Sequence, residues 1–115
     1  VEWDPRDPDR ACKATPVRQV TNFYACYGDE VLPNQKNDEL GHGKERAVAI
    51  ADVLDAHAGA QDEAVAWKAL RAAAQEPNPE DVTSNTQWSV VFDNTEPAAA
   101  ITLRRHWGDV DAFAL

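Results

Sequence analysis

Cys12, Cys26 and Ser89 have side chains of nucleophilic types. A cysteine becomes reactive when a histidine, a cation or a helix N-terminus lowers its pKa, and neither thiol has a nearby histidine or helix-start motif. Neither lies in a CxxC motif, so a redox site and a zinc ribbon have no support, and the two thiols permit one disulfide or none. Ser89 lacks the GxSxG turn of serine hydrolases. The sequence thus gives little support to an intact small enzyme that uses its own nucleophile.

The three histidines, His42, His57 and His106, are far apart and lie in unlike contexts. A metal site needs ligands at characteristic short spacings, which these residues lack. We expect surface histidines, with no metal and no organic cofactor.

Two further polar residues stand at the ends of predicted elements. Asn22 falls near the end of a predicted strand, where asparagine is ordinarily a turn or cap former. Arg46 falls in the first turn of a predicted helix, where arginine is usually a solvated side chain. Taken alone, neither residue indicates a function.

The elements that must position these residues follow from residue type and spacing. Residues 1–16 are rich in Pro, Asp and Arg and predict an irregular lead-in. The β-branched and aromatic residues of 17–24 predict a strand, and the polar stretch 27–43 predicts a long connection, a candidate for a functional or a mobile loop. Apolar residues at helical spacing predict helices over 44–57 and 62–75, the second capped by Asp62.

The last third alternates as strands do. Residues 86–93 and 99–104 predict a hairpin joined by a turn at 94–97, and a short strand follows at 110–114. Trp88 and Phe92 fall on the apolar face of the first strand, so we expect them, with Trp67, in the core. The order β–α–α–β–β–β predicts an α+β fold, with helices on one face of an antiparallel sheet.

Composition limits the class of partner. The 115 residues are 43% hydrophobic and 27% charged, which is typical of a globular protein. A net charge of −9 disfavours nucleic acid and anionic membranes, and no apolar run approaches the ~20 residues of a membrane span. The chain contains no methionine and begins at Val1, which suggests processing or a missing start. We expect a soluble protein whose compartment is undetermined, the cytoplasm being slightly favoured.

Several segments, in order, resemble one family of enzymes. They are Val20-Thr21-Asn22, then Gly43-Lys44-Glu45-Arg46, then the stretch from Asn85 to Asp93, followed by Leu103-Arg104-Arg105. Together they are similar to the second half of the choloylglycine hydrolase and penicillin V acylase group, which cleave linear amide C–N bonds. Acyltransferases that act on penicillin precursors share this ending. The resemblance covers nearly all of residues 17–115, and its order and spacing are more specific than any one motif.

The resemblance implies an αββα sandwich, of which this chain is part, and a cysteine nucleophile at a mature N-terminus whose α-amine is the base. It implies that Asn22 helps to hold the oxyanion. It also implies that Arg46 lies beside the nucleophile and supports its ionised form. Phe23 is bulkier than the usual residue after that asparagine, so the match is weaker there.

The family's N-terminal cysteine has no counterpart here, because Cys12 is internal and supplies no α-amine. We therefore expect this chain to be inactive alone. Its partner would be a segment or chain with the N-terminal cysteine, or a second copy of itself, and the whole enzyme would act on a small acyl-amide. This hypothesis predicts an unpaired sheet edge or an exposed apolar face. The alternative is a non-enzymatic α+β interaction module, a stable monomer with satisfied sheet edges.

Overall fold

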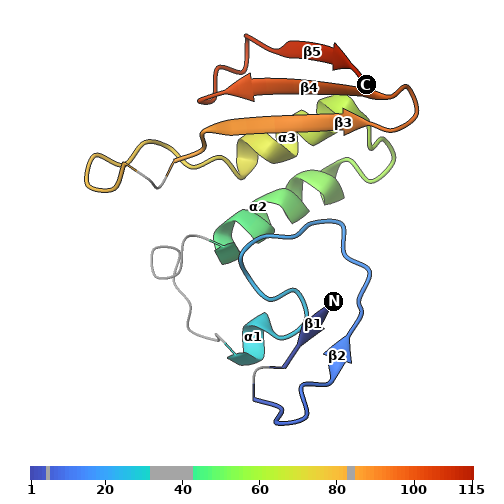
Figure 1. Ribbon diagram of the computed structural model, residues 1–115, viewed down its shortest axis with the longest axis vertical. Coiled ribbons are helices and arrows are strands. Elements are labelled where there is room, and N and C mark those ends of the chain that lie inside the picture. Colours follow the sequence, from blue (N-terminus) through green and yellow to red (C-terminus); the bar gives the residue numbers. More distant parts are fainter. Residues whose placement is uncertain (5, 32–42, 83–84) are drawn as a thin grey trace.

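The computed structural model describes residues 1–4, 6–31, 43–82 and 85–115 (Figure 1). These residues form two antiparallel sheets and three helices, which confirms the α+β class. The elements in chain order are β1 (Glu2–Trp3), β2 (Cys12–Lys13), α1 (Gly28–Val31), α2 (Gly43–Ala56), α3 (Glu63–Ala72), β3 (Trp88–Asp93), β4 (Ala98–Leu103) and β5 (Asp111–Ala114). Residues 32–42, most of the predicted 27–43 connection and including His42, lie outside the described residues. No described helix is both long and apolar enough to span a bilayer.

The larger sheet has the strand order β3-β4-β5 and follows the predicted hairpin. The register pairs Trp88 with Leu103 and Asp93 with Ala98. The side chain of Asp93 accepts hydrogen bonds from the amides of Thr95 and Glu96, which close the first turn. Short-range capping of this kind is what Asp supplies in turns, so the hairpin is encoded locally.

The turn after β4 carries backbone strain. Arg104 and Arg105 have positive φ angles of 47° and 64°, in the left-handed region that non-glycine residues rarely occupy. The fully buried hydroxyl of Thr102 faces this turn and bonds to the carbonyls of His106 and Asp109. Arg105 reaches across to the carbonyls of Gln75 and Thr86. These contacts offset the strain and fix the turn.

The prediction that Trp88 and Phe92 are core residues is wrong. They are 61% and 59% exposed, whereas Ser89, on the opposite face of the same strand, is 6% exposed. Helix α3 contacts β3, and the sheet face that it meets bears small side chains, including Ser89 and Thr102. The alternation was predicted correctly, but a helix approaches a face of small residues more closely than a face of large rings. Trp67, on α3, is half-buried against the edge of the Trp107 ring.

The two long helices match their predicted ranges closely. Asp62 caps α3 as expected, accepting a 3.0 Å hydrogen bond from the amide of Val65. The helix ends at Ala72 and not at Gln75, because Gln75 exchanges two hydrogen bonds with Thr86 at the approach to β3. These bonds draw the chain out of the helix and toward the sheet.

The strand predicted over 17–24 is not formed. Only an isolated bridge between Thr21 and Phe23 is present there, and the segment has no strand partner among the described residues. The segment instead lies along α2, held by an ion pair of Arg18 with Asp55 at one end and by Thr21 at the other. The 1–16 lead-in, expected to be irregular, contains the short β1–β2 pair. A strand needs a ladder partner, which residue propensity cannot supply.

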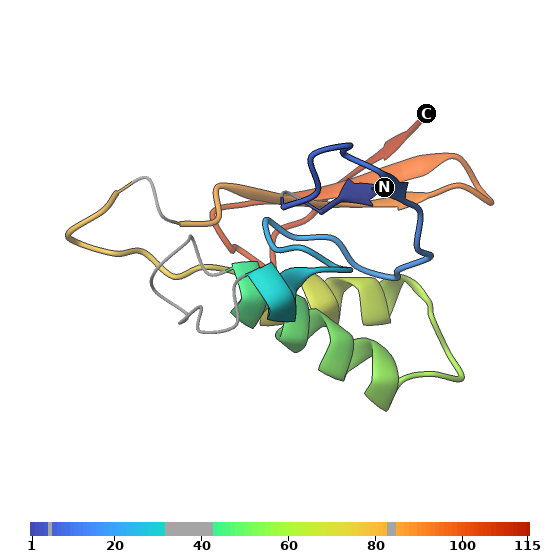
Figure 2. The same cartoon turned by 90° about the horizontal axis from the view of Figure 1, so that it is seen from below.

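The layers are seen edge-on in Figure 2, with α2 and α3 on one side and the sheet β3–β5 on the other.

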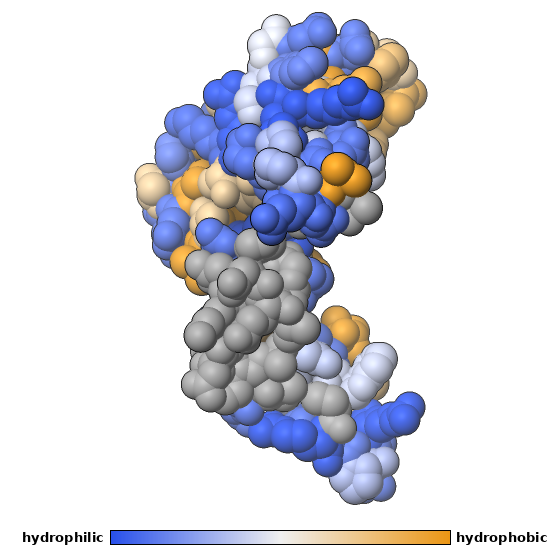
Figure 3. Space-filling view, turned by 90° about the vertical axis from the view of Figure 1, so that its left-hand side faces the viewer, coloured by the Kyte–Doolittle hydropathy of each residue, from blue (hydrophilic) through white to orange (hydrophobic). Residues whose placement is uncertain are grey.

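The core is small: Val65 and Ala69 are the buried hydrophobic residues of the described chain. The accessible surface is 8197 Å², whereas a folded monomer of this mass exposes about 6,200 Å². The radius of gyration is 16.2 Å, against about 13.4 Å for a compact domain of this length. Figure 3 shows hydrophobic residues at the surface of the part that holds the sheet and the long helices.

Candidate functional site

The structure brings together the two residues that the resemblance singled out. Asn22 and Arg46 are 24 positions apart, and Nη2 of Arg46 donates a hydrogen bond of 2.5 Å to Oδ1 of Asn22. Asn22 comes from the segment that lies along α2, and Arg46 comes from the first turn of α2. Arginine only donates hydrogen bonds, so the amide oxygen of Asn22 must face Arg46, and its Nδ2 becomes the donor end.

Two neighbouring residues hold this contact in place. The hydroxyl of Thr21 donates a 2.7 Å hydrogen bond to the carbonyl of Gly43, the first residue of α2. Gly43 is buried, and a Cβ atom at this position would lie 2.6 Å from Oδ1 of Asn22 and 2.7 Å from its carbonyl oxygen. Only glycine admits so close an approach of two backbones. The Gly-His-Gly stretch before the helix was visible in the sequence, but its role was not.

Phe23 anchors the other side of Asn22. A Cβ atom at Gly28 would lie 2.3 Å from the Phe23 ring, so this ring packs directly on the start of α1. The ammonium group of Lys44 lies 5.5 Å from the centre of the same ring. Phe23, the residue at which the resemblance is weakest, therefore has a defined structural role beside the candidate site.

Asn22 and Arg46 each line a hollow. Asn22 lines a cavity of about 430 Å³ with Phe23, Tyr24 and residues 1–3. Arg46 lines a groove of about 420 Å³ on the side of α2 that faces the C-terminal end of α3. The pair thus stands between two concave surfaces, which is the usual position of binding residues.

Glu2 supplies a fixed negative charge to the first cavity. Its carboxylate accepts hydrogen bonds from the amides of Ala25, at 2.5 Å, and Cys26, at 2.7 Å. Partial burial alone would raise the pKa of Glu2. The hydrogen bonds from the two amides lower the pKa by more than burial raises it, so the pKa of Glu2 lies below its usual value. Glu2 therefore stays ionised and ties the N-terminal residues to the segment that carries Asn22.

The other residues considered from the sequence lie elsewhere or have structural partners. Both cysteines are free thiols; Cys12 is exposed, and the half-buried Cys26 bonds to the hydroxyl of Thr15. The ring of His57 bonds to the carbonyl of Val53 and to Lys68, and His106 is exposed. Within the described ranges, no three His, Cys, Asp or Glu side chains are grouped to hold a metal ion.

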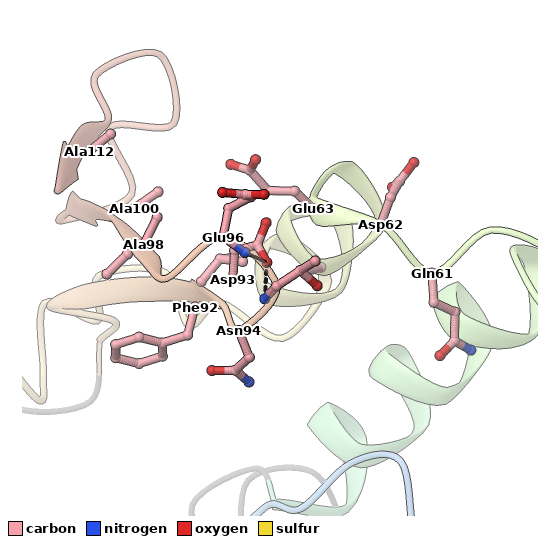
Figure 4. Close-up of a pocket in the computed structure, with 14 residues that line it drawn as sticks. Gln61, Asp62, Glu63, Phe92, Asp93, Asn94, Glu96, Ala98, Ala100 and Ala112 are labelled. Carbon is pink, nitrogen blue, oxygen red and sulfur yellow. Dashed lines mark hydrogen bonds between the residues drawn. The ribbon is translucent and has the colours of Figure 1, made fainter. Parts of the chain in front are cut away.

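A third hollow, of about 660 Å³, lies between the start of α3 and the β3–β4 turn (Figure 4). Alanines of the sheet contribute to its walls, and four carboxylates line it: Asp62, Glu63, Asp93 and Glu96. Hydrogen bonds from the amides of Thr95 and Glu96 lower the pKa of Asp93. Since Asp62 caps α3 and Asp93 caps the turn, two of these four carboxylates already have structural roles.

Comparison with protein-family models, with curated proteins and with solved structures finds no match to this chain. The function of the chain is therefore inferred from the resemblance in its sequence and from the geometry around Asn22 and Arg46.

Proposed function

We propose that this chain is the C-terminal part of an amide hydrolase or acyltransferase whose N-terminal cysteine is supplied by another segment or chain. The observation that carries the proposal is the hydrogen bond between Asn22 and Arg46. The sequence resemblance named these two residues for separate roles at one active centre, and the fold places them in contact. Besides joining its segment to the start of α2, the pair places polar groups at the edge of a cavity.

The chemistry follows from the donor groups of the pair. The α-amine of the N-terminal cysteine takes the proton of its own thiol, and the sulfur then attacks the amide carbonyl. Negative charge develops on the carbonyl oxygen, and the Nδ2 group of Asn22 would donate a hydrogen bond to it. Arg46 fixes the orientation of that amide, and its positive charge favours the thiolate. The amine leaves with a proton, and water or a second amine releases the acyl group.

The open sheet supports the same proposal. Trp88, Phe92, Leu103 and Phe113 are each more than half exposed, and they lie on the sheet face opposite to α3. Half of an αββα sandwich would likewise have helices on one face of its sheet and leave the other face bare, and the two sheets of such a sandwich pack about 10 Å apart. The companion segment would supply the second sheet.

The proposal is tested by purifying the protein from its natural source and measuring intact masses together with N-terminal sequences. We expect a companion segment that begins with cysteine, and hydrolysis of acyl p-nitroanilides by the assembled protein. Blocking the N-terminal amine should abolish the reaction. A stable monomer of this chain, with no companion and no hydrolysis, would contradict the proposal and favour an interaction module.

A further inference from the structure

A groove of about 310 Å³ lies between α2 and the segment 17–25. Arg18 of the segment pairs with Asp55 near the end of α2. The hydroxyl of Thr21 bonds to the first residue of the helix, so the segment and the helix run antiparallel. Figure 1 shows the segment, in blue, beside α2. The groove therefore has one wall of helix and one wall of irregular chain.

The helical wall is a single stripe of α2. Its members follow one another at spacings of three and four residues and are Lys44, Ala47, Val48 and Ala51. From the first to the last of them the helix rises about 10 Å. The next position on the stripe is Asp55, which is paired with Arg18. The apolar part of the wall thus ends at a lysine on one side and at an ion pair on the other.

The opposite wall is also mainly apolar. It is formed by Val17, Val20, Phe23, Tyr24 and Ala25, with Gln19 and Thr21 as its polar members. Val20 is 80% exposed, and Val48 on the helical wall is 52% exposed. A groove that leaves apolar side chains in water on both of its walls favours a ligand with an apolar body.

Among the described residues, Lys44 is the charged side chain that lines the groove. Its ammonium group lies 5.5 Å from the centre of the Phe23 ring, which belongs to the opposite wall. Lys44 also lies in the first turn of α2, where the positive end of the helix dipole adds to its charge. Its neighbours Glu45 and Arg46 line a different groove. One end of this groove therefore carries a cation.

We propose that the groove binds a linear alkyl carboxylate, with the carboxylate beside Lys44 and the alkyl chain along the apolar part of the stripe. The length of the stripe sets the length of the ligand. An extended chain advances about 3.5 Å for every three bonds, so about 10 Å holds about eight to ten carbons. Neither Asn22 nor Arg46 lines the groove, so the inference goes beyond the proposed function and does not depend on it.

The test is a titration of the full chain with sodium octanoate, followed through the amide signals of the protein in two-dimensional NMR. We expect shifts that saturate at Ala47, Val48 and Ala51 with a millimolar Kd, while the signals of β5 stay unchanged. Octylammonium has the same chain and a cationic head, and it should bind at least fivefold more weakly, although the protein carries a net charge of −9.

Chain length gives a second readout. A fully buried CH₂ group changes Kd about fourfold. In an open groove each CH₂ is covered on one side, so we expect about twofold for each group and about fourfold weaker binding for hexanoate than for octanoate. Equal affinities of the two carboxylates would contradict an alkyl chain that lies along the stripe.

Two pairs of matched variants locate the ligand. Lys44→Gln should remove the preference for octanoate over octylammonium, whereas Lys68→Gln, at an exposed lysine of α3, should keep it. Val48→Glu should abolish binding, whereas Val82→Glu, at a valine that is 77% exposed and does not line the groove, should not. Equal affinity of the unmodified chain for the two head groups, shifts that do not saturate, or equal effects within either pair would overturn the inference.

Discussion

Gly43 lies so close to Asn22 that a single added carbon at Gly43 would fall 2.6 Å from the amide oxygen of Asn22 and 2.8 Å from its carbonyl carbon. One of these neighbours is backbone and cannot move aside cheaply. The start of α2 and the segment that carries Asn22 are therefore fitted to each other, and the contact of Asn22 with Arg46 depends on that fit.

We predict that Gly43→Ala destabilises the chain by about 1–3 kcal/mol, because it overpacks a close backbone contact. Thermal or urea unfolding measures the change. Gly59→Ala is the control, since a Cβ atom there meets nothing within 4 Å. It should be neutral, or stabilising by about 0.4–1 kcal/mol through the unfolded state. Equal losses in the two variants would mean that the fit is not as described.

The cap of α3 gives a second prediction. Asp62→Ala removes the hydrogen bond to the amide of Val65 and should lower the free energy of unfolding by about 0.5–2 kcal/mol. Asp62→Asn keeps a cap acceptor and should retain most of the stability. Gln61→Ala, at the exposed preceding residue, should have no measurable effect. A loss at Gln61 as large as that at Asp62 would argue against a capping role.

Arg105 joins the end of α3 to the start of β3 through the carbonyls of Gln75 and Thr86, at 3.3 and 3.2 Å. Its side chain is 14% exposed, and Glu76 lies 3.4 Å from Nε. Arg105→Lys should lower stability by about 1–3 kcal/mol, because an ammonium group cannot reproduce the planar fork of donors. Arg104→Lys changes its exposed neighbour in the same way and should be neutral. Denaturation of both variants under one set of conditions compares them directly.

Asp4 titrates under the influence of Arg6. The side-chain hydrogen bond from Arg6 is the main cause that lowers the pKa of Asp4 from 3.8 to about 2. A carboxyl group whose pKa is lower in the folded state stabilises the fold at any pH above its pKa in the unfolded state. For Asp4 this contribution is lost as the pH falls from about 4 toward 2. NMR titration of the Asp4 carboxyl carbon measures the shift. Arg6→Gln should raise the pKa toward 3.8, although the backbone amide of residue 6 still donates to Asp4, and Arg10→Gln should leave the pKa low.

The parts of the fold that the sequence predicted are those fixed by local contacts. The helices over 44–57 and 62–75, the Asp62 cap and the turn closed by Asp93 all depend on residues a few positions apart. The strand predicted over 17–24 fails because its residues have strand propensity but no strand to pair with among the described residues. Propensity describes the chain alone, whereas a ladder depends on a neighbour.

The prediction of which face of the sheet is buried was also wrong. Trp88 and Phe92 alternate as predicted, but α3 packs on the face of Ser89 and leaves the rings exposed. Alternation identifies two faces and does not say which one a helix will cover. For the candidate site, the resemblance predicted roles for Asn22 and Arg46 that remain predictions, and the contacts of Thr21 and Gly43 beside them required three-dimensional distances.

The most direct test of the central claim is the rate of amide hydrolysis by the protein assembled with the proposed cysteine-bearing segment, compared between Asn22→Ala and Asn94→Ala. Asn94 lies in the exposed β3–β4 turn and serves as the control. Loss of one oxyanion donor should lower kcat about 10²–10³-fold in Asn22→Ala with little change in KM. The Asn94→Ala protein should keep the unmodified rate. Equal rates for the two variants would contradict a catalytic role for Asn22 and the assignment of this chain to an amide hydrolase.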